Sequence, residues 1–119
     1  MAKAVTPKRG EIWTVSFDPT VGAEIGKARP AVVIGVESIG RLPLRLVVPI
    51  TDWKSIYTSY PWFVELLPNA SNGLSKHSGA DAFQVKSVSE MRFVRRLGVV
   101  AEDDLLAIAE AIAMCVGAP

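Results

Sequence analysis

Cysteine and histidine are almost absent from this sequence, and none of its apolar runs is long. Among the 119 residues there is one cysteine, Cys115, and one histidine, His77. A single cysteine excludes an internal disulfide and favours a reducing compartment, and a single histidine excludes a zinc site built from several histidines. No apolar run approaches the ~20 residues of a membrane span, and the first ten residues lack the apolar segment of a secretory signal. We therefore expect a cytoplasmic protein with no metal site and no membrane span.

Basic side chains are missing from residues 101–119, which carry only Glu102, Asp103, Asp104 and Glu110. All 13 Lys and Arg residues lie in residues 1–100 together with 8 acids, so this part has a net charge of +5 and the C-terminal part of −4. A basic body is compatible with a polyanionic substrate. Three of the acids also suit the first turn of a helix, so the charge pattern leaves an ordinary solvated surface as an equal alternative.

Half of the residues are hydrophobic, which is enough for one folded domain covering residues 1–119 with a small core. Apolar alternation and short apolar runs predict strands. An apolar stripe at positions i, i+3, i+4 and i+7 predicts one helix at the end of the chain. The strands are expected over residues 11–17, 31–36, 44–50, 62–66, 82–88 and 93–97, and the helix over residues 102–116. This order indicates a mainly β fold with a C-terminal helix, built on a strongly bent sheet or half-open barrel.

The second strand, residues 31–36, is almost continuously apolar, which is typical of a strand buried on both faces. A polar loop precedes it and contains Glu24, Lys27 and Arg29. Pro30 biases Arg29 towards an extended backbone, so the guanidinium is expected at the mouth of this strand. From residue types alone, a surface ion pair between Glu24 and Arg29, worth about 0–1 kcal/mol, is the simpler interpretation.

Two further segments carry side chains suited to nucleic acid. In residues 52–60, Trp53, Lys54 and Ser55 offer a ring, a cation and a hydroxyl for single-stranded bases, although Trp53 equally suits the end of a small core. Pro49 is expected to end strand pairing and to place Thr51 at the start of this exposed loop. Three arginines near the last strand are either a solvated face or a phosphate-tracking surface, and the sequence leaves this open (Arg92, Arg95 and Arg96).

Residues 9–36 carry an ordered set of motifs: Gly10, Trp13, the turn Asp18-Pro19-Thr20, Gly22, Glu24, and the run Arg29-Pro30-Ala31-Val32-Val33. This set resembles the opening of the MazF/PemK toxin endoribonucleases, the toxin halves of bacterial type II toxin–antitoxin pairs. The resemblance continues more weakly through residues 49–51, residues 84–88 and the last helix. It implies a small SH3-like, half-open β-barrel of the MazF/CcdB type with a long C-terminal helix, usually a symmetric homodimer.

The resemblance also implies a function. Proteins of this family are sequence-specific, metal-independent endoribonucleases that cleave single-stranded RNA, inhibit translation and growth, need no cofactor, and are neutralised by a cognate antitoxin. The family's catalytic positions correspond to Arg29, Thr51 and Glu24, and an arginine is better suited to stabilising charge than to removing a proton. The residues expected to contact RNA are Lys27, Trp53, Lys54, Ser55, Gln84 and Lys86.

One departure from the family pattern concerns Phe83, which stands where many members have an Asp before the Gln. Asp81 is expected on the same strand face as Phe83 and would partly replace that acid. Two alternatives to an active nuclease therefore stay open. One is a gyrase-directed binding protein of the CcdB kind, disfavoured because residues 114–119 contain no tryptophan. The other is an inactivated homologue kept as a regulatory partner.

Overall fold

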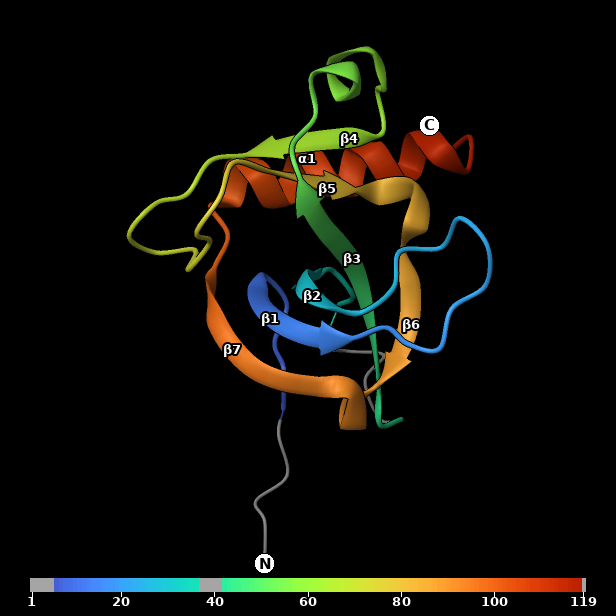
Figure 1. The fold of residues 1–119 in the computed structure, drawn as a ribbon, viewed down its shortest axis with the longest axis vertical. Coiled ribbons are helices and arrows are strands. Elements are labelled where there is room, and N and C mark those ends of the chain that lie inside the picture. Colours follow the sequence, from blue (N-terminus) through green and yellow to red (C-terminus); the bar gives the residue numbers. More distant parts are fainter. Residues whose placement is uncertain (1–5, 37–41, 119) are drawn as a thin grey trace, which may run out of the picture.

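The computed structural model describes residues 6–36 and 42–118, which form an antiparallel sheet and a C-terminal helix (Figure 1). This confirms the mainly β fold expected from the sequence. No helix in these two ranges is long and apolar enough to cross a membrane. The strands are β1 (Glu11–Ser16), β2 (Ala28–Val33), β3 (Leu44–Asp52), β4 (Phe63–Leu66), β5 (Ser78–Asp81), β6 (Lys86–Ser89) and β7 (Phe93–Val99); the helix is α1 (Glu102–Cys115), and short 3-10 turns are η2 (Ser55–Ser59), η3 (Ala82–Gln84) and η4 (Glu90–Arg92).

The strands follow the order β4-β5-β3-β2-β1-β7, with β6 pairing to β3 as well. Every recorded pairing is antiparallel. The sheet curls strongly, and β7 sweeps around β1 without pairing to β4 in the described part of the chain (Figure 1). The result is a half-open barrel, as the sequence indicates.

Strand β3 is the centre of this sheet because it exchanges partners along its length. Its first half pairs with β6, from Leu44 to Val47, and its last residues pair with β5, from Ile50 to Asp52. The expectation that pairing ends at Pro49 is therefore wrong. Pro49 lies where one edge of β3 changes from β6 to β5, a position at which a residue without an amide hydrogen is tolerated. Thr51 consequently lies inside the strand rather than in an exposed loop.

Strand β2 begins and ends three residues earlier than the strand predicted over residues 31–36. Its second half, Ala31–Val33, is buried on both faces, as the apolar run indicates. Val32 belongs to a core that includes Ile12, Val48 and Ile108 of helix α1. The neighbouring residues of β2 face a second core with Phe17 and others on the opposite face of the sheet (Val15, Phe17, Ala31, Val33, Val47, Val88 and Phe93). The alternation of side chains along a strand assigns successive residues to the two cores. This burial on both faces anchors the strand that carries Arg29 near its start.

The prediction of a strand over residues 82–88 is wrong for its first half. Residues Ala82–Gln84 form the turn η3, since the Asp81 carboxylate accepts a hydrogen bond from Phe83 N at 3.2 Å and caps the turn. Strand β5 lies between the predicted strands 62–66 and 82–88 and was not predicted, because its sequence SGAD has no apolar alternation. Gly79 allows close packing there, since a Cβ would lie 3.0 Å from the Trp53 ring and 3.1 Å from the Phe63 ring and would displace these rings by a few tenths of an ångström.

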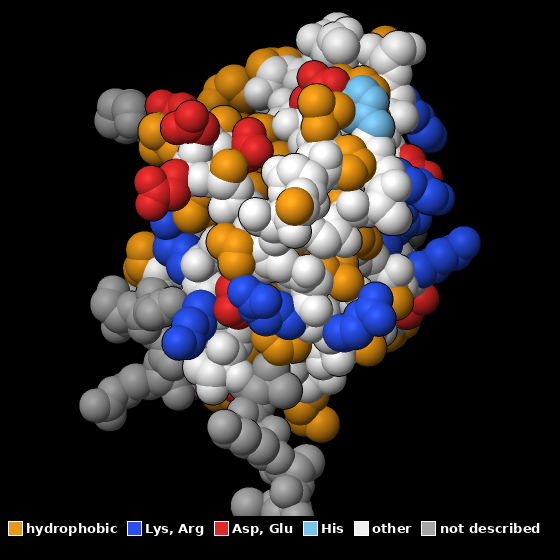
Figure 2. Space-filling model, turned by 90° about the vertical axis from the view of Figure 1, so that its left-hand side faces the viewer, with side chains coloured by type: hydrophobic (Ala, Val, Ile, Leu, Met, Phe, Trp, Pro, Cys, Tyr) orange, Lys and Arg blue, Asp and Glu red, His pale blue; other side chains and the backbone are white. Residues whose placement is uncertain are grey.

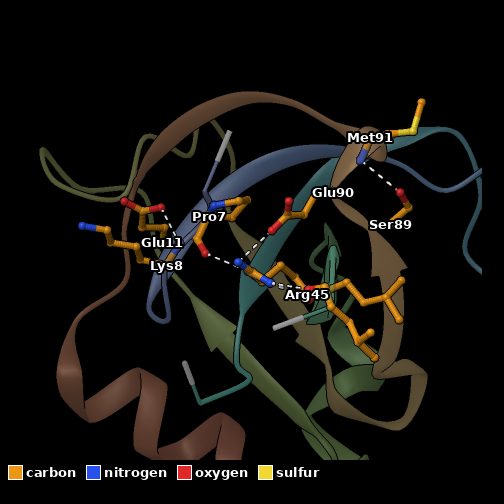
Figure 3. A network of polar contacts seen from close by, with 9 residues as sticks. Pro7, Lys8, Glu11, Arg45, Ser89, Glu90 and Met91 are labelled. Carbon is orange, nitrogen blue, oxygen red and sulfur yellow. Dashed lines mark hydrogen bonds and ion pairs between the residues drawn. The ribbon is translucent and has the colours of Figure 1, made fainter. Parts of the chain in front are cut away.

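A network around Arg45 fixes the beginning of β3 (Figure 3). Its Nε donates to Pro7 O at 3.1 Å, and its guanidinium pairs with the Glu90 carboxylate at 2.7 Å. The same guanidinium donates to Leu44 O at 2.7 Å. This arginine therefore joins the segment before β1, strand β3 and turn η4, and stabilises the strand that carries Thr51.

Candidate active site

Arg29 and Thr51 lie next to each other, on neighbouring strands β2 and β3. The register pairs Ala31 with Pro49, and continuing it by two residues brings Arg29 opposite Thr51. Arg29 Nη1 lies 3.4 Å from Thr51 Oγ1, and Arg29 Nε donates to Gly26 O at 2.8 Å. The guanidinium is thus held at two points while its other N–H groups stay available for an anion. The structure therefore brings together two of the three residues that the family resemblance names as catalytic.

A groove of about 500 Å³ surrounds this pair; we call it the Arg29 groove. Residues from β1, β2, β3, β7 and the segment before β5 line it. Asp52 is the one carboxylate among the described residues that line this groove. Lys and Arg side chains gather in a band across the face on which β7 and the β4–β5 connection lie (Figure 2). The groove therefore suits a polyanion, with four cations on its walls (Lys27, Arg29, Lys76 and Arg95).

The three arginines near β7 have different roles, a distinction that the sequence left open. Arg92 Nη1 donates to Ser16 O at 3.1 Å and Asp18 O at 2.6 Å, so it holds the backbone at the end of β1. Arg96 Nε bonds the Glu11 carboxylate at 2.9 Å. Arg95 is exposed and lines the Arg29 groove, and its side chain has no hydrogen bond or ion pair to another described residue. No sequence signal identifies Arg95, because its role depends on which strand lies beside β7.

Glu24 lies in a different groove of about 440 Å³, which we call the Glu24 groove; Gln84, Lys86 and Phe83 line it too. Glu24 and Ile25 line this groove and Lys27 to Pro30 line the Arg29 groove, so only Gly26 separates the lining residues of the two grooves along this loop. The Glu24 carboxylate accepts from Val21 N at 2.7 Å. No ion pair joins Glu24 to Arg29 within residues 6–36 and 42–118, which removes the simple ion-pair interpretation. The structure does not bring Glu24 into contact with Arg29 or Thr51.

The other residues expected to contact RNA fall into two groups. Lys27 is exposed on the wall of the Arg29 groove, with a positive φ of 65° and its N–H donating to Asp18 Oδ1 at 2.9 Å. Lys86 lines the Glu24 groove, with Nζ 5.9 Å from the centre of the Phe17 ring. Trp53, Lys54 and Ser55 line neither groove.

Trp53 is instead part of an aromatic cluster after β3. Its ring stacks on His77 at 5.4 Å and meets Tyr57 edge-on at 5.6 Å. His77 Nε2 lies 2.5 Å from the Glu65 carboxylate. These contacts give Trp53 a packing role at the end of the core, and its expected contact with RNA stays a prediction.

Phe83 and Asp81 do not lie on one strand face, although the sequence predicts that they do. The Phe83 ring is 68% exposed on the Glu24 groove. Asp81 is buried, lines neither groove, and accepts from Phe83 N and Gln84 Nε2. Burial raises the pKa of Asp81. The two residues do not share a strand face, because β5 ends at Asp81 and Phe83 lies in η3. Among the described residues, no cluster of three or more His, Cys, Asp or Glu is arranged to hold a metal ion.

Known proteins resemble this chain over nearly its whole length. Residues 8–116 match the family described as PemK-like, MazF-like toxin of type II toxin–antitoxin system. The endoribonuclease MazF9 of Mycobacterium tuberculosis is 36% identical over 111 residues, covering 88% of this chain and 92% of the relative.

Two solved structures have the same fold. The MazF structure from Deinococcus radiodurans superposes with a TM-score of 0.80 at 24% identity, covering 95% of this chain and 98% of the other. A mycobacterial endoribonuclease in complex with its cognate antitoxin superposes with a TM-score of 0.75 at 17% identity, covering 96% and 98%. With the family match across residues 8–116, these similarities lead to one conclusion. The chain belongs to the PemK-like, MazF-like toxins of type II toxin–antitoxin systems.

Proposed function

We propose that this protein is an endoribonuclease toxin that cleaves single-stranded RNA at a short sequence without a metal ion. The observation that carries the proposal is the Arg29–Thr51 pair in a groove walled by cations. The family match and the endoribonuclease relative at 36% identity support the same activity. Residues 1–119 would act as one domain in the cytoplasm, where messenger RNA is available.

The proposed reaction is an in-line attack of the ribose 2′-oxygen on the adjacent phosphorus. A 2′-O–P bond forms, the P–5′-O bond breaks, and the products are a 2′,3′-cyclic phosphate and a 5′-hydroxyl. The 2′-hydroxyl proton goes to a base and the leaving 5′-oxygen gains a proton. The atoms, electrons and protons of this step balance without an oxidant, a cofactor or a metal ion.

Each proposed catalytic side chain has a role that follows from its contacts. Arg29 offers its remaining N–H groups to the phosphoryl oxygens, on which charge develops in the transition state. Thr51 Oγ1 accepts from Arg29, so its own hydrogen is free to donate to a phosphoryl oxygen. We assign Glu24 as the base for an RNA strand that crosses from the Arg29 groove into the Glu24 groove. Lys27, Lys86 and Arg95 would contact flanking phosphates.

The test is incubation of the full chain with a long single-stranded RNA in EDTA, followed by mapping of the cut positions and end groups. We expect discrete cuts with cyclic or 3′-phosphate ends. Removal of a charge-stabilising donor costs about 10²–10³ in kcat, so Arg29→Ala and Thr51→Val should each lose that much, whereas Thr51→Ser should keep most activity. Met91→Ala, a change at a side chain that is 94% exposed, is the control.

Undiminished cutting by Arg29→Ala would contradict the assigned site. Absence of cutting by the wild type would favour an inactivated homologue, and inhibition of gyrase supercoiling without RNA cleavage would favour the gyrase-directed alternative. Both outcomes contradict the proposed activity.

We also propose two protein partners. The mycobacterial structure contains a cognate antitoxin, and this chain has the same fold. An antitoxin with an acidic and apolar C-terminal segment would compete with RNA for the cations of the Arg29 groove. A second copy of the chain would complete a homodimer, as the family resemblance implies.

A further inference from the structure

We propose that Gln84, oriented by Asp81, is a positioning residue for Arg29. It acts through the loop between β1 and β2, which it holds where the Gly26 carbonyl anchors the guanidinium. This inference rests on the proposed function, since positioning has meaning only if Arg29 contacts the substrate. It replaces the expectation that Gln84 reads RNA directly.

The side-chain amide of Gln84 is fully engaged within the protein. Its Oε1 accepts from Ile25 N at 2.7 Å, and its Nε2 donates to Asp81 Oδ2 at 3.2 Å and to Ala23 O at 3.5 Å. The orientation of the amide is determined by its neighbours, because a backbone N–H only donates and an ionised carboxylate only accepts. No donor is left over for a nucleobase without breaking one of these bonds.

Ile25 is directly followed by Gly26, whose carbonyl accepts from Arg29 Nε at 2.8 Å. The loop has little freedom on its other side. A Cβ on Gly26 would lie 2.8 Å from both Asp18 Oδ1 and Thr20 Oγ1, so these side chains pack directly against its backbone. The Gln84–Ile25 bond therefore determines where the Gly26 carbonyl lies, and that carbonyl determines how the guanidinium meets Thr51.

Asp81 determines the orientation of Gln84. It is buried at the end of β5, with Oδ1 accepting from Phe83 N and Oδ2 accepting from Gln84 Nε2. Because β5 pairs with the end of β3, Asp81 lies on the same rigid part of the sheet as Thr51. The contacts thus run from the sheet through Asp81 and Gln84 to the loop, and return to the sheet at Arg29.

Two substitutions separate positioning from RNA reading. Gln84→Met keeps the length of the side chain and removes its hydrogen bonds. Asp81→Asn leaves one acceptor for two donors, so its NH₂ must face either Phe83 N or Gln84 Nε2. Both variants should loosen the loop between β1 and β2. Only Gln84→Met changes a residue that lines the Glu24 groove, so an effect shared by both variants cannot come from a lost RNA contact of Gln84.

Three quantities would be measured on the full-length chain: hydrogen exchange of the Ile25 amide, kcat and KM on an RNA with one cleavage site, and the map of cut positions. We expect protection of Ile25 to fall at least about tenfold in Gln84→Met, because the acceptor of its amide hydrogen is removed. It should fall less in Asp81→Asn, where that acceptor remains but is no longer held in orientation by the carboxylate. A small displacement of a catalytic group lowers kcat by about 10- to 100-fold, whereas KM should stay within about twofold. The double variant should be no slower than the slower single variant, and the cut positions should not change.

Glu110→Gln, a carboxylate-to-amide change on an exposed face of α1, is the matched control and should alter none of these quantities. Altered cut positions in Gln84→Met with normal cleavage by Asp81→Asn would overturn the proposal in favour of RNA reading. Unchanged Ile25 protection in Gln84→Met would overturn it as well, even if the wild type cleaved no RNA. If Asp81→Asn fails to fold, Gln84→Met still decides between these outcomes.

Discussion

At the scale of the residue, the site depends on how acceptors are distributed around a few donors. Arg29 gives one N–H to Gly26 O and another to Thr51. These two bonds orient the guanidinium and leave its other N–H groups available to a ligand. Gln84 gives both of its amide hydrogens to protein acceptors. Two polar side chains that look equally suited to RNA in the sequence are therefore different in the fold: one is available to a phosphate and the other is not.

Asp81 provides a pH-dependent test at this scale. Burial raises its pKa above the ordinary value of 3.8, although hydrogen bonds from Phe83 and Gln84 act in the opposite direction. The folded state therefore binds this proton more tightly than the unfolded state does. The associated stability is complete below pH 3.8 and is lost as the pH rises through the raised pKa.

The measurement is the free energy of unfolding in urea for the wild type and for Asp81→Asn, between about pH 3 and pH 7. The stability of the wild type relative to the variant should decline as the pH rises. A difference that is constant, or that grows with pH, would mean that burial does not dominate the titration of this carboxyl.

At the scale of the element, β7 shows how one strand divides its charges between stability and binding. Arg96 bonds Glu11, which also accepts from Trp13 Nε1 at 3.0 Å. Burial acts to raise the pKa of Glu11, but hydrogen bonds from Lys8 N, Trp13 and Arg96 outweigh it, so the pKa is lowered. Arg95, adjacent in sequence, faces the Arg29 groove instead.

Arg95→Ala should therefore weaken RNA binding without affecting stability. For a single strand, the loss of one phosphate contact lowers the salt dependence of log K by about 0.7. Binding would be measured across salt concentrations with an RNA that carries a 2′-deoxy nucleotide at the cleavage site and cannot be cut. Arg96→Ala should keep the salt dependence of the wild type. Equal slopes for Arg95→Ala and wild type would assign Arg95 to the solvated surface.

At the scale of the molecule, two apolar cores on opposite faces of one bent sheet hold the site in place. One core lies under α1 and contains Ile12, Val32 and Ile108; the other contains Phe17 and Val33. Strands β2 and β3 contribute to both cores. Arg29 lies near the start of β2, and Thr51 lies near the end of β3. The rigidity of Arg29 and Thr51 therefore depends on packing that is distant from RNA.

Ile108→Ala tests this dependence. Ile108 is fully buried, so the substitution should lower the free energy of unfolding by about 2–5 kcal/mol. Leu106→Ala on the same helix is the matched control, since Leu106 is 59% exposed and its loss should cost no more than about 0.5 kcal/mol. Denaturant unfolding of both variants decides the matter. Equal losses would show that α1 does not stabilise the sheet through this face.

Periodicity in the sequence was sufficient for most of the fold and insufficient at specific places. Helix α1 and strands β1, β3, β4 and β7 begin or end within two residues of their predicted limits, because each has a clear apolar pattern. Strand β5 was missed because its residues are small and its burial comes from rings of other segments, Trp53 and Phe63. Turn η3 was missed because the Asp81 cap competes with strand pairing.

The sequence by itself determined the class of fold and the family, and through the family resemblance it pointed to Arg29 and Thr51, since local apolar patterns and short motifs carry that information. Only the tertiary structure decided that Glu24 lies in a neighbouring groove, that Arg95 joins the cations of the site, and that Gln84 is bound to the loop rather than free. Each of these depends on contacts between segments far apart in the chain, and such contacts leave no periodic trace in the sequence.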